Sequence, residues 1–214
     1  MDPYLASTYF IDFEHPAVKN MLAHCLVDDE LAEREKAVRL FYAVRDGIRY
    51  NPRVEAFIRD TNKVSRVIAY GEGFCVQKAL VLIALARSVS IPARLGLADI
   101  VNHLITGELI DAMGTNIFTC HGYVELYLDG KWIKATPTFD AGMCQKKGLQ
   151  DVEFDGKHDA VLPERDLAGN RHIEYLQYFG TYADMPFEFI MEKWQEHYPN
   201  LKSYIADQLN SRTA

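Results

Sequence analysis

The strongest structural signal in this chain is the stretch Gly71-Glu72-Gly73-Phe74-Cys75-Val76-Gln77-Lys78-Ala79. Its two glycines allow a tight backbone that can approach another element closely just before the cysteine. From Cys75 to about Ser88 the residues are apolar nearly all round, as they are in a helix buried at the centre of a domain. The stretch therefore predicts a central helix with Cys75 in its first turn.

A cysteine in the first turn of a helix is well placed to react. The unpaired amide groups and the positive end of the helix dipole favour thiolate over thiol, and the same amides can bind an oxyanion. We therefore expect Cys75 to be the one cysteine with a strongly depressed pKa. Free cysteines are also among the most buried residues, so a structural Cys75 is an equal alternative on this stretch alone.

The composition indicates a cytoplasmic globular protein. With 214 residues, 49% of them hydrophobic, the chain can form one core, and we expect a single domain over residues 1–214. A net charge of -7 argues against nucleic-acid and membrane partners. We expect no secretory signal and no membrane span. The four cysteines include no C-x-x-C pair, which fits reduced thiols. The oligomeric state is left open.

Residues 1–47 are predicted to be helical scaffold. One helix is expected from about Ala17 to Val27, and a longer one that ends near Gly47. His24 and Cys25 are neighbours in the first of these helices. Because adjacent helical residues point in different directions, they cannot form a nucleophile–base pair.

The segment between this scaffold and the glycine loop can line a site. A short helix is expected from Thr61 to Ala69. Tyr50, Asn51 and Tyr70 could each donate a hydrogen bond to an oxyanion, and ordinary packing remains open for all three.

The second informative stretch runs from Cys120 to Asp140. Asp129-Gly130 lies between two runs of alternating hydrophobicity, which predicts a hairpin with a two-residue turn. That turn places Glu125 opposite Lys134 as an ion pair on one face. The pairs on the other, apolar face are Leu126–Ile133 and Val124–Ala135.

His121 lies on the Glu125 face, near the start of the first hairpin strand. A histidine at the end of a strand is well placed to face a cysteine on a packed helix. If the hairpin register extends beyond Ala135, His121 pairs with Thr138. Asp140 is then a diagonal neighbour of His121, roughly 7–8 Å away.

The order of these motifs resembles the transglutaminase-like superfamily. Its pattern has Gly-x-Cys at a helix start, His-x-Trp-x-Glu on a strand and Trp-x-x-x-Asp-Pro-Thr on the next strand. The match runs from about Ile48 to Asp140, and Ile91-Pro92-Ala93-Arg94 also looks like this family. The resemblance implies an α+β, papain-like fold, in which a central helix bearing the cysteine packs on an antiparallel sheet bearing the histidine and the acid.

The resemblance implies roles for three residues. Cys75 is expected to be the nucleophile, His121 its base and Asp140 the acid that orients the histidine. One departure matters: the family has its acid directly before Pro-Thr, and this chain has Thr136 there. Asp140 is the nearest carboxylate to that position. A bulge at Pro137 or a simple capping role for Asp140 remains an alternative.

The implied chemistry is acyl transfer from an amide, as in bacterial transglutaminase-like cysteine proteases. The substrate is expected to be a peptide or protein that offers an amide side chain or a peptide bond. Water or an amine resolves the thioester, and the sequence leaves that choice open. No metal and no organic cofactor are expected.

Other interpretations remain open. Thr136 favours an inactive protein-interaction module of the same fold, and Cys75, Cys120 and Cys144 with histidines could bind a metal. Asp155 and His158 are a second source of acid–base groups. We expect the core to span residues 48–140. The extension 141–214, rich in aromatic residues, is expected to pack on it, with a helix from Glu188 to His197.

Overall fold

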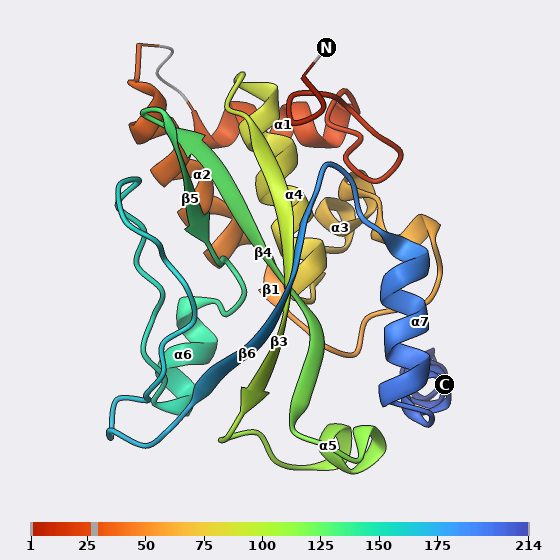
Figure 1. Cartoon of the computed structure of the whole chain (residues 1–214). Coiled ribbons are helices and arrows are strands. Elements are labelled where there is room, and N and C mark those ends of the chain that lie inside the picture. Colours follow the sequence, from red (N-terminus) through yellow and green to blue (C-terminus); the bar gives the residue numbers. More distant parts are fainter. Residues whose placement is uncertain (1, 27–29, 214) are drawn as a thin grey trace.

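A four-stranded antiparallel sheet with helices packed against it organises the structure, a computed structural model that describes residues 2–26 and 30–213 (Figure 1). The strand order is β5-β4-β3-β6. The strands are β1 (Arg49–Tyr50), β2 (Glu72–Gly73), β3 (Ala93–Asn102), β4 (Ile117–Leu128), β5 (Lys131–Ala135) and β6 (Ile173–Tyr182). The helices are α1 (Pro16–Cys25), α2 (Glu33–Gly47), α3 (Val64–Tyr70), α4 (Cys75–Ser88), α5 (Glu108–Met113), α6 (Ala141–Lys147), α7 (Phe187–His197) and α8 (Leu201–Thr213), and residues Asp60–Asn62 form a 3-10 turn.

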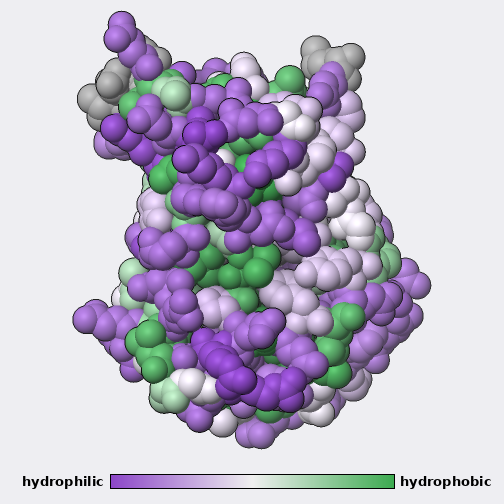
Figure 2. Space-filling model, turned by 60° about the vertical axis from the view of Figure 1, so that its left-hand side comes forward, coloured by the Kyte–Doolittle hydropathy of each residue, from purple (hydrophilic) through white to green (hydrophobic). Residues whose placement is uncertain are grey.

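Helix α4 is the predicted central helix, and it begins at Cys75 as expected. Every residue from Val76 to Arg87 is buried, because α4 packs against β3 and β4 on one side and α2 and α3 on the other. The α+β fold inferred from the sequence is confirmed. Hydrophilic residues cover most of the face shown in Figure 2, and hydrophobic ones gather near its middle.

The hairpin register is confirmed as far as it was derived from the turn. Glu125 pairs with Lys134, and the apolar pairs form as predicted. The extension of that register to His121 and Thr138 is wrong, because β5 ends at Ala135. The Thr136 N–H donates to Ala160 O instead, and the next residue, Pro137, has no N–H to continue the ladder.

Most predicted helices form, with shifted ends. The first predicted helix, α1, ends at Cys25, and its predicted end, Val27, lies outside the described residues. The second, α2, ends at Gly47 as expected. The segment Thr61–Ala69 divides into the 3-10 turn and α3, and helix α7 begins one residue earlier than predicted. Strand β6 was not predicted. Its exposed and part-buried positions do not alternate, since it lies at the edge of the sheet.

A short parallel pairing brings the end of α2 beside the glycine loop. Tyr50 of β1 pairs with Gly73 of β2, and Gly71 adopts a left-handed conformation with φ of 67° at the end of α3. Glycine adopts this conformation without the steric cost that a side chain adds. Tyr50 is thereby placed two residues from Cys75 across the pairing. No helix in the described ranges is long and apolar enough to cross a membrane.

Lys78 joins α4 to the end of α2. The side chain is fully buried, and Nζ donates to Arg45 O at 2.8 Å and Ile48 O at 2.5 Å. These are carbonyl groups at a helix end, where partners within the helix are missing. Burial lowers the pKa of Lys78 to about 7, and Asp140 and Asp46 act in the opposite direction.

We expect Lys78→Met to lower the free energy of unfolding by about 1–3 kcal/mol, because it leaves buried carbonyl groups unpaired. Urea unfolding measures this, with exposed Lys146→Met as the control. The unfolded chain holds the Lys78 proton more tightly than the folded chain between about pH 7 and pH 10.4. Wild-type stability should therefore gain with rising pH in that window, and the variant should lack this gain. Equal stability of the two variants would contradict the assignment.

Candidate active site

Cys75 is the first residue of α4, and the loop before it is held in place. The side chain of Gln77 locks the helix start, since Oε1 accepts from the Phe74 N–H at 3.3 Å and Nε2 donates to Asn62 Oδ1 at 3.2 Å. Cys75 itself is partly exposed. The thiol is therefore presented at the N-terminal end of an otherwise buried helix.

Strand β4 approaches the first turn of α4 more closely than any side chain would allow. A Cβ built on Gly122 would lie 2.7 Å from Val76 Cα, a distance that real Cβ atoms essentially never show. The Gly122 N–H acts to lower the pKa of the Cys75 thiol. His121 precedes Gly122 on β4, and it lines the same cavities as Cys75.

A β-bulge lies immediately before His121. Two steps along β3, from Ala98 to Ile100, are matched by three along β4, from His121 to Phe118. Cys120 in this bulge has a φ of 58°, which is uncommon for a residue other than glycine. Bulges next to active sites re-aim side chains, and such strain is typical of functional positions.

Two cavities meet at this place, and both are lined by Tyr50, Cys75, Phe118 and His121. The large cavity, of about 330 Å³, is further lined by Ile100, Asn102, Leu104, Ile105, Thr138, Phe139, Met143, Lys147, Leu149, Asp166 and His172. The small cavity, of about 50 Å³, is further lined by Pro52, Ala56, Phe74, Leu109, Met113, Thr119, Cys120, Trp194, Tyr198 and Ile205. The cysteine and the histidine therefore share two adjoining spaces.

Burial keeps both groups uncharged. It raises the pKa of the Cys75 thiol to about 11, while the N–H groups of Gly122, Val76 and Cys75 act in the opposite direction. It lowers the pKa of His121 to about 3. The expectation of a depressed pKa at Cys75 is therefore wrong, because desolvation exceeds the effect of the helix start. Burial also raises the pKa of the other three cysteines.

His121 has no acid beside it in the described structure. Its Nε2 is buried without a hydrogen-bond partner, and so are the hydroxyl groups of Thr136 and Thr138. The Tyr175 ring lies edge-on to His121, with 6.1 Å between ring centroids. Burial raises the pKa of Tyr175, and the Leu162 N–H and the Thr136 hydroxyl act against it, although no hydrogen bond of normal geometry joins the two hydroxyl groups. Tyr175 thus lies beside both His121 and Thr136.

Asp140 is not brought to His121. Its Oδ1 accepts from the Met143 N–H at 2.9 Å as the N-cap of α6, and its Oδ2 accepts from the Tyr50 N–H at 3.1 Å. It lines neither cavity. The geometry gives Asp140 the capping role that the sequence left open, because the hairpin ladder that would have carried it to His121 ends at Ala135.

The three residues considered as oxyanion donors, Tyr50, Asn51 and Tyr70, differ in whether they lie beside Cys75. Tyr50 lines both cavities, and its ring packs edge-on against Phe139 with 5.0 Å between centroids. Burial, and secondarily Cys75, raises the pKa of Tyr50. Asn51 is engaged with Glu72 and the Arg53 N–H, and Tyr70 is 62% exposed. Of these residues only Tyr50 lies beside the cysteine.

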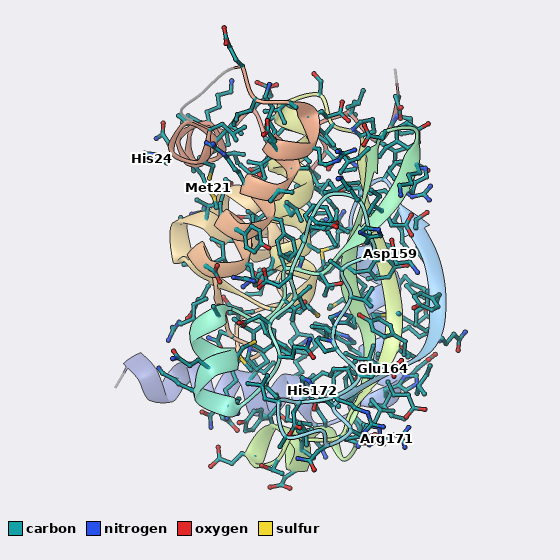
Figure 3. The ribbon with its side chains drawn as sticks, turned by 90° about the vertical axis from the view of Figure 1, so that its left-hand side faces the viewer. Met21, His24, Asp159, Glu164, Arg171 and His172 are labelled. Atoms are coloured by element: carbon teal, nitrogen blue, oxygen red, sulfur yellow. The ribbon has the colours of Figure 1, made fainter. Side chains whose placement is uncertain are left out.

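Sequence reasoning missed His172, Tyr175 and Trp194 as individual members of the site. His172 is 1% exposed and stacks on Phe139 at 6.0 Å, with Nδ1 buried and unpaired. Figure 3 shows it in the interior near α6, with Arg171 and Glu164 further out. The aromatic richness of the C-terminal segment was the available signal, but only the fold selects which of its residues face the cysteine.

The alternative groups considered from the sequence lie elsewhere. His158 Nδ1 pairs with Asp155 Oδ2 at 2.7 Å on the exposed surface, and neither residue lines a cavity. Within the described ranges, no three His, Cys, Asp or Glu side chains gather into a set that could hold a metal ion. The cysteines Cys75, Cys120 and Cys144 therefore do not form a metal site there.

A protein-family model, the transglutaminase-like superfamily, matches residues 20–137 of this chain. The matched range includes Cys75 and His121 and ends before Asp140. No curated protein sequence matches the chain significantly.

Two solved structures resemble the chain. One, from Cytophaga hutchinsonii, is described as a "putative cysteine protease"; it is 15% identical with a TM-score of 0.46, and the match covers 84% of this chain and 53% of that one. The other, from Parabacteroides distasonis, is described as a "putative protease". It is 18% identical with a TM-score of 0.38, and the match covers 62% of this chain and 26% of that one. This chain therefore spans about half the length of the first protein and about a quarter of the length of the second.

We expect the alkylation of Cys75 by iodoacetamide to accelerate with rising pH up to about pH 11, without a plateau near neutrality. Below its pKa a thiol gains tenfold in thiolate for each pH unit, and burial sets that pKa high. Mass spectrometry of the labelled peptide follows Cys75 separately from Cys25, Cys120 and Cys144. A pH-independent rate between pH 5 and pH 8 would contradict the uncharged resting state.

Proposed function

Because the chain belongs to the transglutaminase-like superfamily, we propose that it is a cysteine-dependent enzyme acting on amide bonds of peptides or proteins through a thioester on Cys75. The observation that carries this proposal is the meeting of Cys75 and His121 at two adjoining cavities. A largely apolar space with a few polar groups beside a nucleophile is the form of a substrate site.

The first half of the reaction forms the thioester. The Cys75 sulfur attacks the carbonyl carbon while its proton passes to His121, and the amide C–N bond breaks as His121 returns that proton to the leaving amine. The Cys75 N–H at the start of α4 is one oxyanion donor, and the Tyr50 hydroxyl is the second. The position of Tyr50 in both cavities supports this role.

His121 works as a general base from its neutral form. Cys75 and His121 do not rest as an ion pair, since desolvation favours the neutral thiol and the neutral imidazole. The imidazolium forms only as the sulfur attacks, when charge also develops on the oxyanion. A histidine without an acid partner still performs this transfer, with less stabilisation of its positive form.

The orienting groups differ from the triad expected from the sequence. We assign the orientation of His121 to the edge-on ring of Tyr175, which Thr136 adjoins. We assign to Asp140 the positioning of Tyr50 through its backbone N–H. The acid would then act on the oxyanion side of the site rather than on the base.

An inactive interaction module is the second candidate. The unpaired Nε2 of His121 and the threonine in place of the acid favour it, because both weaken general-base catalysis. Direct assays of turnover separate the two candidates.

We expect Cys75→Ala to abolish cleavage or deamidation in a peptide library followed by mass spectrometry, while circular dichroism and the unfolding midpoint stay close to wild type. The removed atom is small and alanine is favourable in a helix. Cys25→Ala, at a residue that lines neither cavity, is the matched control and should keep full activity. Wild-type protein that modifies no peptide and no acyl ester would favour the interaction module instead.

The orienting residues give a second prediction. Asp140→Ala should lower the free energy of unfolding by about 0.5–2 kcal/mol, because α6 loses its N-cap. Loss of an acid that orients a catalytic histidine lowers the rate by about a hundredfold or more, and we expect a smaller loss of rate here. The pH profile should keep its midpoint, because Asp140 does not touch His121.

Thr136→Asp should raise the pKa of His121 and shift Cys75 alkylation to lower pH, since the family pattern has its acid at this position and Thr136 adjoins Tyr175 beside the imidazole. Thr136→Val keeps the shape of the side chain without its hydroxyl and is the control. A steep loss of rate in Asp140→Ala together with an altered pH profile would return the acid role to Asp140.

A further inference from the structure

The two cavities give the thioester two neighbouring spaces. An acyl group on the Cys75 sulfur can occupy the large cavity and leave the small cavity open to the molecule that attacks next. His121 lines both, so the base that receives the first proton also borders the second space. The size and the lining residues of the small cavity therefore influence which molecule attacks the thioester.

The wall of the small cavity is fixed to β4. Trp194 Nε1 donates to Thr119 O at 3.2 Å, and the Tyr198 hydroxyl accepts from the Thr119 N–H and donates to Ile117 O at 2.8 Å. Trp194 also packs edge-on against Phe57 and Phe74, each at 5.4 Å between ring centroids. Neither aromatic side chain can turn aside without breaking these contacts, so the cavity keeps its size.

The small cavity offers no carboxylate that could pair with a positive charge. The residues that line it in the described structure include no aspartate and no glutamate. The nearby carboxylate of Asp99 accepts from the Thr119 hydroxyl and the Cys120 N–H, and it does not line the cavity. An alkylammonium ion that entered would lose its hydration without gaining a carboxylate partner, which costs several kcal/mol.

We propose that the small cavity is the acyl-acceptor site, that it admits water and other small neutral nucleophiles, and that it excludes alkylammonium ions. A volume of about 50 Å³ exceeds the ~10–15 Å³ that one water needs. The proposal rests on the thioester proposed at Cys75, and it makes the enzyme a hydrolase.

The step balances without any further reactant. The water oxygen bonds to the thioester carbonyl carbon as His121 takes one of its protons. The C–S bond then breaks, and the proton returns from His121 to the sulfur. The products are a free carboxylic acid and the Cys75 thiol.

The test uses p-nitrophenyl acetate, which acetylates reactive thiols without requiring the natural substrate. The full-length protein is treated with this ester in an amine-free buffer near neutral pH, with hydroxylamine or cadaverine added at equal concentration. Mass spectrometry measures acetyl-Cys75 and the products acetate, acetohydroxamate and acetylcadaverine. Each product ratio is divided by the same ratio for S-acetyl-N-acetylcysteamine, a thioester free in solution, which removes the intrinsic reactivity of each nucleophile.

We expect the normalised transfer to cadaverine to fall on the order of a hundredfold below the transfer to hydroxylamine, which is uncharged at neutral pH. Met113→Asp places a carboxylate on the small cavity and should raise transfer to cadaverine. Leu104→Asp, on the large cavity, should not. Leu109→Asp replaces Met113→Asp if that variant does not fold.

Two results would overturn the inference. The first is wild-type transfer to cadaverine that equals transfer to hydroxylamine after normalisation. The second is discrimination that persists unchanged in both small-cavity variants, because the selectivity would then arise elsewhere. Absence of acetyl-Cys75 altogether would instead contradict the proposed function.

Discussion

The close contact between Gly122 of β4 and Val76 of α4 is the constraint on which the rest of the site depends. A hydrogen atom in place of a methyl group lets the strand reach the first turn of the helix. The Gly122 N–H acts to lower the pKa of the Cys75 thiol, and the preceding residue, His121, lines both cavities together with Cys75. A side chain at this position would push β4 away from the first turn of α4, which carries Cys75.

Burial sets the electrostatics of the site more strongly than the helix start does. Cys75 has the first-turn position that favours a thiolate, yet desolvation keeps both it and His121 neutral. The unpaired Nε2 of His121 is a cost to the folded state, since a buried polar atom without a partner loses its hydration. Unsatisfied groups of this kind are rare in folded proteins and typical of functional positions.

Elements distant in the sequence hold the site together. Lys78 of α4 binds carbonyl groups at the end of α2, which leads into β1 and Tyr50. Asp140 at the start of α6 holds the Tyr50 N–H from the other side. Trp194 of α7 closes the small cavity by bonding to β4. The C-terminal segment thus contributes to the walls of the site as well as to the sheet, where it supplies β6.

The sequence by itself determined the elements whose signals are local. The apolar run after Cys75 fixed the bounds of α4, and the Asp129-Gly130 turn fixed the register of the hairpin, because helix periodicity and turn geometry act over a few residues. The family pattern followed from the same two stretches, and the family model confirms it.

Only the tertiary structure decided where the partners of Cys75 and His121 lie. The ladder beyond Ala135 stops because Thr136 bonds to Ala160, a residue that no local pattern connects to it, and Asp140 is left as a helix cap. Desolvation, which reverses the expected pKa of Cys75, depends on everything packed around the thiol. Local rules describe how a segment folds, whereas the neighbours of a side chain, and therefore its charge, come from segments that the chain brings together only when it folds.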